Sequence, residues 1–401
     1  MAAADERVRM ASGWDAIVGQ ADAVAQLQRA AAVDPDVDGQ GIGGSGAMTH
    51  AWLLTGPPGS GRSNLAYAFA AALLSPPTGI DDAVATLVEA RTHPDLVTLS
   101  TEGVLITIAQ ARAVVQRASL APSTARYRVI VVEDADRMAE RTSNALLKAL
   151  EEPPPETVWI LCAPSEADLL PTIRSRVRTL TLQVPDPAAV AQLLIDRDGV
   201  APEIAERAAR EAQSHIGMAR RLATSEEARA RRAETLQIAM RVSTAASAVL
   251  AAARYVEIAT ADADALSAER DEAERAQALH QLGIEPGGTV PPALRRQLKE
   301  LEDAQKQRAK RGMRDGVDRI LVDLLSLYRD ILMTQLGVGS ELVNEAMRPT
   351  VLAAAAYLQR AAVIDVLDSI RTARERIEAN VPPVLALEAM LVRAARAAQR
   401  R

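Results

Sequence analysis

The sequence has few aromatic residues and a single cysteine. Aromatic side chains make up 2% of the 401 residues, with one Phe. This excludes nucleic-acid modules that stack bases on aromatic platforms, and it disfavours a large all-β protein, which would draw on aromatic and β-branched residues. Because one cysteine cannot form an internal disulfide or a multi-cysteine zinc site, we predict no zinc and place Cys162 in the core.

The sequence also lacks long apolar runs and a strong excess of charge of one sign. No uninterrupted run reaches the ~18 residues of a membrane span, and the first ten residues, MAAADERVRM, lack the apolar core of a signal peptide. We therefore expect no membrane partner and a cytoplasmic location. With 46 Lys+Arg against 52 Asp+Glu, a uniformly basic DNA-coating protein is excluded. The basic stretch 295–314 is left with two interpretations, a solvated helix face or a DNA contact.

What the sequence does contain favours an α/β domain followed by helices. Short apolar runs at 52–55, 129–132, 158–162 and 177–182 predict buried strands, and amphipathic stretches between them predict helices, an alternation typical of a parallel sheet. Residues 34–49 predict a loop. We predict three domains: an α/β domain over 1–183, a small helical unit over 184–240 broken at Gly199 and Gly217, and a helical domain over 241–401 with a break at 283–292.

A glycine-rich segment, GPPGSGRS from Gly56 to Ser63, lies between a predicted strand and a predicted helix. It fits the phosphate-loop pattern G-x-x-x-x-G-K-[ST] except at the lysine, which is Arg62 here. Glycines allow backbone N–H groups to point at phosphate oxygens, and the following helix adds its positive end. Ser63 would ligate Mg²⁺. The alternative is a glycine-rich turn without a ligand.

Two further segments suggest nucleotide chemistry. The strand at 129–132 ends in Glu133 and Asp134, where a Walker B pair would hold Mg²⁺ and orient water. The order is reversed from the usual Asp-Glu, which moves each carboxylate by about one methylene and predicts poor hydrolysis; the alternative is an acidic cap. Arg174 and Arg176 flank Ser175 before a strand. They are either surface charge or, read with the glycine loop, one of them is presented to a neighbouring subunit's nucleotide.

Together these segments resemble the clamp-loader branch of the AAA+ ATPases, and within it the family of delta-prime subunits of bacterial DNA polymerase III. The resemblance begins at Trp14 to Gln20 (WDAIVGQ) and continues through HAWLLTGPPG at 50–59 and the His93-Pro94-Asp95 marker. Its most specific part is SNALLKALEEPP at 143–154, followed by LLPTIRSR at 169–176. The implied fold is an AAA+ α/β domain with a parallel sheet flanked by helices, then a helical lid and an all-α collar.

The resemblance implies a stator subunit in a hetero-pentamer with delta and gamma/tau subunits, which places a sliding clamp on primed DNA. It implies ATP or ADP with Mg²⁺ as cofactor and an arginine finger in trans from Arg176, with Glu133 and Asp134 as a degenerate Walker B. Ser165 falls where active members carry a sensor Asn. The implied nucleotide-binding residues are Val18, Gly56, Gly59, Ser60, Gly61, Arg62, Ser63, Asn64 and the second-sensor Arg220.

Several positions depart from the family pattern. The Ser-Arg motif ends in Val177 instead of Cys, and the family's four-cysteine zinc module is missing from 75–92. Arg62 and the Glu133-Asp134 pair both point to weak or no intrinsic ATPase. The alternative is an ATP-hydrolysing motor subunit of the gamma/tau type, in which Arg62 does the work of the lysine.

Overall fold

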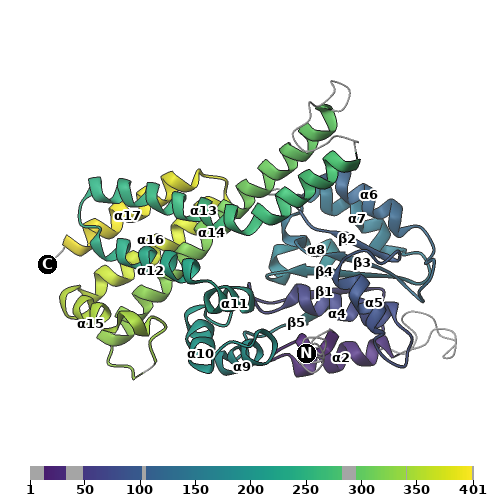
Figure 1. Cartoon of the computed structure of the whole chain (residues 1–401), viewed down its shortest axis with the longest axis horizontal. Helices are drawn as coiled ribbons and strands as arrows, with labels where there is room; N and C mark the ends of the chain where they lie inside the picture. The colour runs from purple at the N-terminus through teal and green to yellow at the C-terminus, as the bar shows by residue number, and fades with distance from the viewer. Residues whose placement is uncertain (1–12, 33–47, 102–104, 282–294, 340, 400–401) are drawn as a thin grey trace. The chain divides into compact units, whose positions relative to one another are not determined.

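The computed structural model describes residues 13–32, 48–101, 105–281, 295–339 and 341–399 (Figure 1). The predicted break at 283–292 and most of the predicted loop at 34–49 lie outside these residues. The chain divides into two compact units, Met1–Thr224 and Ser225–Arg401. Each is described by itself, and the division into three domains stays a prediction.

The first unit is built on a five-stranded parallel sheet with the strand order β2-β3-β4-β1-β5. Three of its strands are buried along their whole length, as expected for a parallel sheet covered on both faces. The four predicted strands are confirmed, and β2 was missed. The strands are β1 (Ala51–Thr55), β2 (Leu96–Leu99), β3 (Arg128–Val132), β4 (Thr157–Ala163) and β5 (Arg178–Thr181).

Helices cover both faces of the sheet (Figure 1). Side chains alternate along each strand, so Trp52 and Leu54 pack with α2 and α4 while Leu53 packs with α6 and α7. The predicted α/β fold class is thereby confirmed. The helical elements up to the last strand are η1 (Gly13–Ala16), α2 (Ala21–Ala31), α4 (Arg62–Leu74), α5 (Asp82–Glu89), α6 (Ile108–Ala118), η2 (Ala135–Arg137), α7 (Glu140–Glu151), η3 (Glu166–Asp168) and α8 (Pro171–Arg174).

Three helices follow the sheet in the same unit: α9 (Pro187–Asp198), α10 (Pro202–Glu211) and α11 (Ile216–Thr224). Gly199 ends α9 in the left-handed region, so the break predicted there is confirmed. The break predicted at Gly217 is wrong, because Gly217 lies inside α11. The chain turns earlier, at Gln213 and Ser214, which both have positive φ although neither is glycine.

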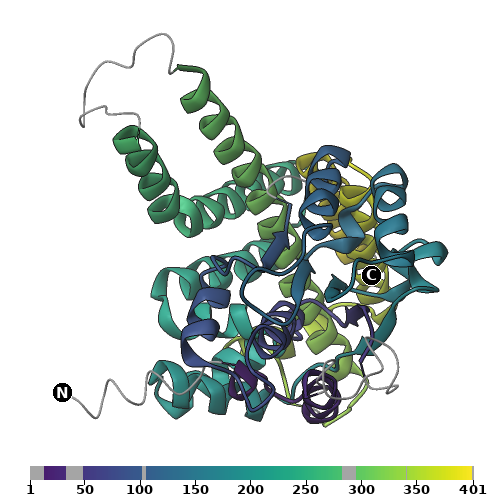
Figure 2. The same cartoon turned by 90° about the vertical axis from the view of Figure 1, so that its right-hand side faces the viewer.

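The second unit is all helical in its described residues, which bears out the predicted helical part. Its core is one cluster of mainly Ala, Leu, Ile and Val side chains from all of the long helices. Helices α13 and α14 run side by side as a long pair (Figures 1 and 2). The elements are α12 (Glu226–Arg241), α13 (Ala245–Gln281), α14 (Arg295–Gln335), η5 (Glu345–Met347), α15 (Arg348–Tyr357), α16 (Arg360–Glu378) and α17 (Pro383–Gln399).

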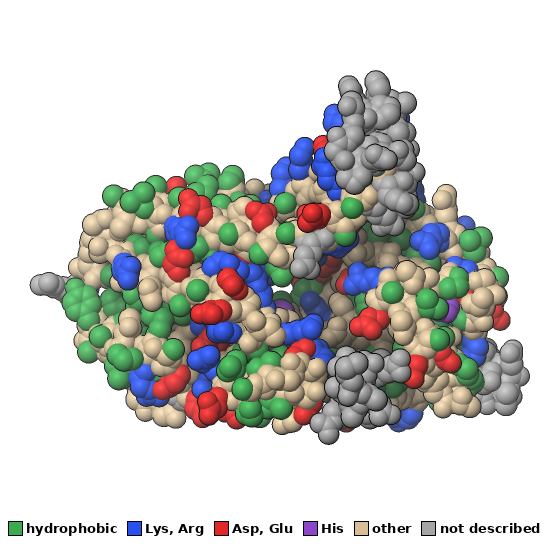
Figure 3. Space-filling view, in the orientation of Figure 1, with side chains coloured by type: hydrophobic (Ala, Val, Ile, Leu, Met, Phe, Trp, Pro, Cys, Tyr) green, Lys and Arg blue, Asp and Glu red, His purple; other side chains and the backbone are tan. Residues whose placement is uncertain are grey.

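The basic stretch 295–314 forms the first half of α14. Arg308 is mostly buried and pairs with Glu274 at 2.5 Å and with Asp271 at 3.1 Å, both on α13. Other cations of the stretch are exposed, and Figure 3 shows blue side chains gathered over this helix pair. They are Arg296, Lys299, Lys306 and Lys310. Part of the stretch therefore joins the two helices, and whether the exposed part contacts DNA stays open.

No single helix among the described residues is long and apolar enough to cross a membrane. One pair, Glu345–Tyr357 with Arg360–Glu378, meets that test of length and composition only when both helices are taken together, and it is bent by 117°. Val363 and Ile370 of its second helix are buried in the core of the second unit.

Candidate phosphate-binding site

The glycine-rich segment forms a tight loop at the carboxyl end of β1, where parallel sheets of this kind place their ligands. Gly56 follows the last strand residue and donates its N–H to the Pro164 carbonyl at 3.2 Å. Gly61 is the left-handed N-cap of α4, so the helix begins at Arg62. The backbone thus has the strand, loop and helix order that the sequence predicts, with the N-terminus of a 13-residue helix at the loop.

Gly59 is the position where only glycine fits. Its φ is +82°, and a Cβ placed on it would lie 2.4 Å from the Cγ and 2.7 Å from the Cα of His215. Both atoms belong to the segment that leads into α11, so the loop between β1 and α4 is in direct contact with the start of that helix. A Cβ placed on Gly61 would lie 3.8 Å from the Cδ1 of Ile216, in the same segment.

Two polar atoms of the loop are buried without a hydrogen-bond partner. They are the Ser60 hydroxyl and one terminal nitrogen (Nη1) of Arg62. Burial lowers the pKa of Arg62, although Cys162 and nearby carboxylates such as Asp136 oppose this. A buried donor without an acceptor costs about 1–3 kcal/mol, and a phosphate oxygen would remove that cost at both atoms. The loop therefore fits the phosphate of a nucleotide.

The rest of the predicted loop residues lie around this pair. Ser63 is half-buried in the first turn of α4 and Asn64 is exposed beside it. Val18 is half-buried in the segment before α2. The structure thus brings Gly56 to Asn64 together, while none of the described contacts joins Val18 to the loop.

Gln20 contacts the loop; it ends the WDAIVGQ segment of the sequence analysis, which gave it no role of its own. Its side-chain amide donates to the Gln183 carbonyl at 2.7 Å and, at 3.4 Å, to the Ser60 carbonyl. Its amide oxygen accepts from the Gln183 N–H at 3.1 Å. Gln20 thus ties the N-terminal segment to the chain leaving β5. The role of Gln20 could have been predicted from the sequence, because a polar side chain between apolar stretches is expected to be buried and hydrogen-bonded.

Glu133, the acid at the end of β3, is already engaged. Its Oε1 accepts from the Tyr67 hydroxyl at 2.7 Å and pairs with Arg91 at 3.0 Å. The Arg91 guanidinium also lies 4.9 Å from the centre of the Tyr67 ring. Burial, and then the Glu133 carboxylate, raise the pKa of Tyr67 well above its ordinary value, so the hydroxyl stays a donor. The neighbouring Asp134 lies 3.9 Å from Arg137.

The two predicted sensor positions are occupied by local contacts. Ser165 caps η3: its hydroxyl accepts from the Ala167 N–H at 3.2 Å, and its own N–H donates to Asp168 at 2.9 Å. Arg220 of α11 pairs with Asp198 at 3.0 Å, and its side chain is 60% exposed. Neither residue shows a described contact with the loop.

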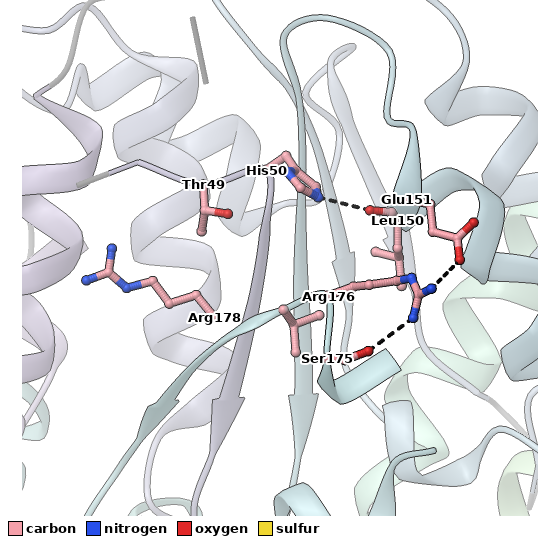
Figure 4. Close-up of a pocket in the computed structure, with 8 residues that line it drawn as sticks. Thr49, His50, Leu150, Glu151, Ser175, Arg176 and Arg178 are labelled. Carbon is pink, nitrogen blue, oxygen red and sulfur yellow. Dashed lines mark hydrogen bonds and ion pairs between the residues drawn. The ribbon is translucent and has the colours of Figure 1, made fainter. Parts of the chain in front are cut away.

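Arg176 lies at the opposite edge of the sheet, in a shallow pocket before β1 and β5 (Figure 4). It pairs with Glu151 at 2.5 Å and donates to the Thr172 carbonyl at 2.6 Å and to the Ser175 hydroxyl at 3.0 Å. In the same pocket, the His50 Nε2–H donates to the Leu150 carbonyl at 2.9 Å. The Arg176 side chain is one-third exposed, so a group outside this unit can reach it.

Comparisons with known proteins find similarity to subunits of DNA polymerase III. A family model described as "DNA polymerase III, delta subunit" matches residues 41–186. DNA polymerase III subunit delta' of Bacillus subtilis is 31% identical over 162 residues, 39% of this chain and 49% of that protein. The Pseudomonas aeruginosa subunit delta' is 35% identical over 160 residues, 38% of this chain and 49% of that protein.

The gamma/tau subunits are also similar. The Mycobacterium tuberculosis H37Rv subunit gamma/tau is 33% identical over 160 residues, 37% of this chain and 27% of that protein. Among solved structures, a DNA polymerase III gamma-subunit-related protein from Thermotoga maritima has a TM-score of 0.38 and 17% identity over 90% of this chain and 96% of that one.

The chain spans about half the length of the curated delta' relatives that it matches. The matched region contains both the phosphate loop and the Ser175-Arg176 segment, and the assignment of a collar after residue 240 stays a prediction. The comparisons support the predicted resemblance: residues 41–186 match the family model, and about 160 residues of the chain are 31–35% identical to the bacterial proteins named DNA polymerase III subunit delta'.

Proposed function

We propose that this chain is a clamp-loader subunit of the delta-prime type. It works in the cytoplasm in a hetero-pentamer with delta and gamma/tau subunits, and the complex places a sliding clamp on primed DNA. The chain binds a nucleotide, ATP or ADP, with weak or no hydrolysis of its own. It supplies Arg176 in trans to the nucleotide of a neighbouring ATPase subunit. The family model over residues 41–186 and the similarity to delta' proteins support this proposal.

The position of Arg176 is the observation that carries the proposal. In the β1–β5 register Arg178 stands opposite Trp52, so residue 176 is level with His50. The phosphate loop starts six residues further along, at Gly56. At ~3.3 Å per strand residue this separation is about 20 Å, which is beyond the reach of an arginine side chain. Arg176 therefore cannot serve the chain's own nucleotide and is available to another subunit.

The chain's own residues suit holding a nucleotide better than cleaving it. The loop N–H groups, the Ser60 hydroxyl and the Arg62 guanidinium would hold phosphate oxygens, and Ser63 is the residue that would ligate Mg²⁺ if the metal accompanied the nucleotide. When bound, the nucleotide supplies phosphate oxygens that accept hydrogen bonds from these donors and balance the positive charge of Arg62. Arg62 offers a planar fork where a lysine would offer a compact charge, and Glu133 is engaged by Tyr67 and Arg91. These features favour the delta-prime type over the motor type.

The test is a complex reconstituted with Arg176→Ala. An arginine finger in trans contributes roughly 10³–10⁵ to the rate at one site, so DNA- and clamp-stimulated ATP turnover at that neighbouring site should be lost. The matched control is Arg174→Ala, because Arg174 is exposed two residues earlier on α8; it should leave turnover unchanged. Full turnover in a complex that has incorporated the Arg176 variant would contradict the finger. A wild-type chain that does not assemble with delta and gamma/tau subunits would contradict the clamp-loader role.

A further inference from the structure

The acid that a magnesium ion would use in this pocket is held by two other residues. Glu133 shares one carboxylate oxygen between the Tyr67 hydroxyl at 2.7 Å and the Arg91 guanidinium at 3.0 Å. Glu133 is largely buried, with 16% of its side chain exposed. We name Arg91, Tyr67 and Glu133 the Glu133 cluster. Within it the negative charge of the carboxylate is balanced by one positive charge at ion-pair distance.

The local backbone favours this arrangement. Tyr67 lies four residues after Ser63 on α4, so the two side chains project from the same face of the helix one turn apart. Arg91 follows the end of α5 with a φ of +59°, a left-handed conformation that a helix end usually gives to glycine. The strained conformation is retained at a residue whose guanidinium covers the Tyr67 ring and pairs with Glu133.

The other acids near Arg62 are Asp134, Asp136 and Asp168. Asp134 lies 3.9 Å from Arg137, Asp168 accepts the Ser165 N–H in the cap of η3, and burial raises the pKa of Asp136. Mg²⁺ dehydrates reluctantly and needs carboxylates that are free to ligate it or its waters.

The phosphate side of the pocket is different. The Ser60 hydroxyl and the Arg62 Nη1 are buried without partners, and the N-terminal N–H groups of α4 point toward the same loop. Charge-assisted hydrogen bonds from a guanidinium to phosphate are stronger than neutral ones. Phosphate oxygens therefore find donors in the loop, whereas Glu133, the acid expected to serve a metal ion, has one of its oxygens engaged by both Tyr67 and Arg91.

We propose that this pocket binds the phosphate of a nucleotide without Mg²⁺, with Arg62 as the neutralising cation and the Glu133 cluster withholding the acid from the metal. The inference rests on the nucleotide binding proposed above and specifies its ligand as metal-free. Tyr67 and Arg91 are positioning residues that act through Glu133.

The experiment measures binding of a fluorescent ADP to the full chain, in EDTA and in Mg²⁺. We expect dissociation constants within about threefold of each other, a difference of less than ~1 kcal/mol. Arg62→Ala should weaken binding at least about tenfold in both conditions, since it removes charge-assisted hydrogen bonds. A wild-type chain that binds ADP more than tenfold tighter with Mg²⁺ would overturn the inference.

A second variant tests the Glu133 cluster itself. Tyr67→Phe combined with Arg91→Ala frees the carboxylate and keeps the Tyr67 ring, so ADP binding should become tighter with Mg²⁺ than with EDTA. The matched control is Arg117→Ala, because Arg117 is an exposed arginine in the last turn of α6; its binding should stay independent of Mg²⁺. If the double variant folds, as judged by its far-UV circular dichroism, and remains indifferent to Mg²⁺, the cluster does not withhold the acid and the inference fails.

The outcomes also separate this inference from the proposed function. A chain that assembles with delta and gamma/tau subunits but binds no ADP in either buffer overturns the inference and leaves the clamp-loader role standing. A chain that binds ADP equally with and without Mg²⁺ but does not assemble supports the inference and contradicts the role.

Discussion

Replacing Asp95 should destabilise the first unit strongly. The carboxylate is fully buried and accepts six hydrogen bonds: from the N–H and hydroxyl of Ser123 at 2.7 and 2.9 Å, from the N–H and hydroxyl of Thr124 at 2.8 and 3.0 Å, from the Ala125 N–H at 3.0 Å and from Arg128 at 3.0 Å. These bonds hold the segment that leads into β3, the strand that ends at Glu133.

The expected magnitude follows from what the substitution leaves behind. Arg128 is 7% exposed, and removing one partner of a buried ion pair costs about 3–5 kcal/mol because the other charge stays buried. Asp95→Ala should therefore lower the free energy of unfolding by about 3–5 kcal/mol. Asp95→Asn should cost at least ~2 kcal/mol, since its NH₂ group would face backbone donors.

The effect should depend on pH in a defined direction. Burial alone would raise the pKa of Asp95, but the hydrogen bonds from Thr124, Ser123 and Ala125 outweigh it and hold the pKa well below its usual range. The folded pKa lies below that of an unfolded Asp, ~3.9. The stabilisation is therefore fully present above about pH 4 to 5 and is lost as the pH falls through and below the unfolded value. Asp95→Ala should lose less stability than wild type on acidification.

Urea unfolding followed by tryptophan fluorescence measures the free energy of unfolding of the first unit. All three Trp residues (Trp14, Trp52 and Trp159) lie in that unit, Met1–Thr224. The control is Asp81→Ala, which removes an exposed N-cap with two backbone hydrogen bonds and should cost ~1 kcal/mol. If Asp95→Ala destabilises the unit no more than Asp81→Ala, the reasoning from the buried hydrogen bonds is refuted.

Three other predictions concern the site. Gln20→Ala should lower the free energy of unfolding of the first unit by about 1–3 kcal/mol in the same urea assay, because it removes two hydrogen bonds between the buried Gln20 amide and the Gln183 backbone; no change would mean that the amide does not tie the segments together. Gly59→Ala should weaken binding of fluorescent ADP and lower the Tm, since its Cβ would meet the His215 backbone; unchanged binding would contradict the packing described here. Burial raises the pKa of Cys162 to about 12, so at pH 8 the thiol should be neutral and should react with a thiol reagent only after denaturation; rapid labelling of the native protein would refute this.

Local patterns allowed the sheet and the loop to be predicted. The runs that became β1, β3 and β4 are buried along their whole length, and the glycine segment depends on residues that are neighbours in sequence. β2 was missed because Leu96–Leu99 has only four residues and includes the polar Thr98. So short a segment does not show the hydrophobic periodicity of a helix or of a strand clearly. The turn at Gln213 and Ser214 was missed because neither is a residue that typically marks a left-handed turn.

The long-range contacts of the site could not be predicted from the sequence. Glu133 meets Tyr67 across 66 positions, and Gln20 meets Gln183 across 163. Such partners are set by the packing of the sheet and its helices and leave no local signal. From the sequence we could predict that the Glu133-Asp134 pair differs from the usual Asp-Glu order of a Walker B motif. Only the structure shows that Tyr67 and Arg91 contact Glu133.

ATP turnover by the isolated chain distinguishes the delta-prime type from the motor type. We expect the chain to bind nucleotide yet to release no phosphate above the rate in buffer, because Arg62 replaces the lysine and the acid at the end of β3 is engaged by Tyr67 and Arg91. Steady Mg²⁺-dependent phosphate release that Arg62→Ala abolishes would contradict it, and would favour a motor subunit of the gamma/tau type.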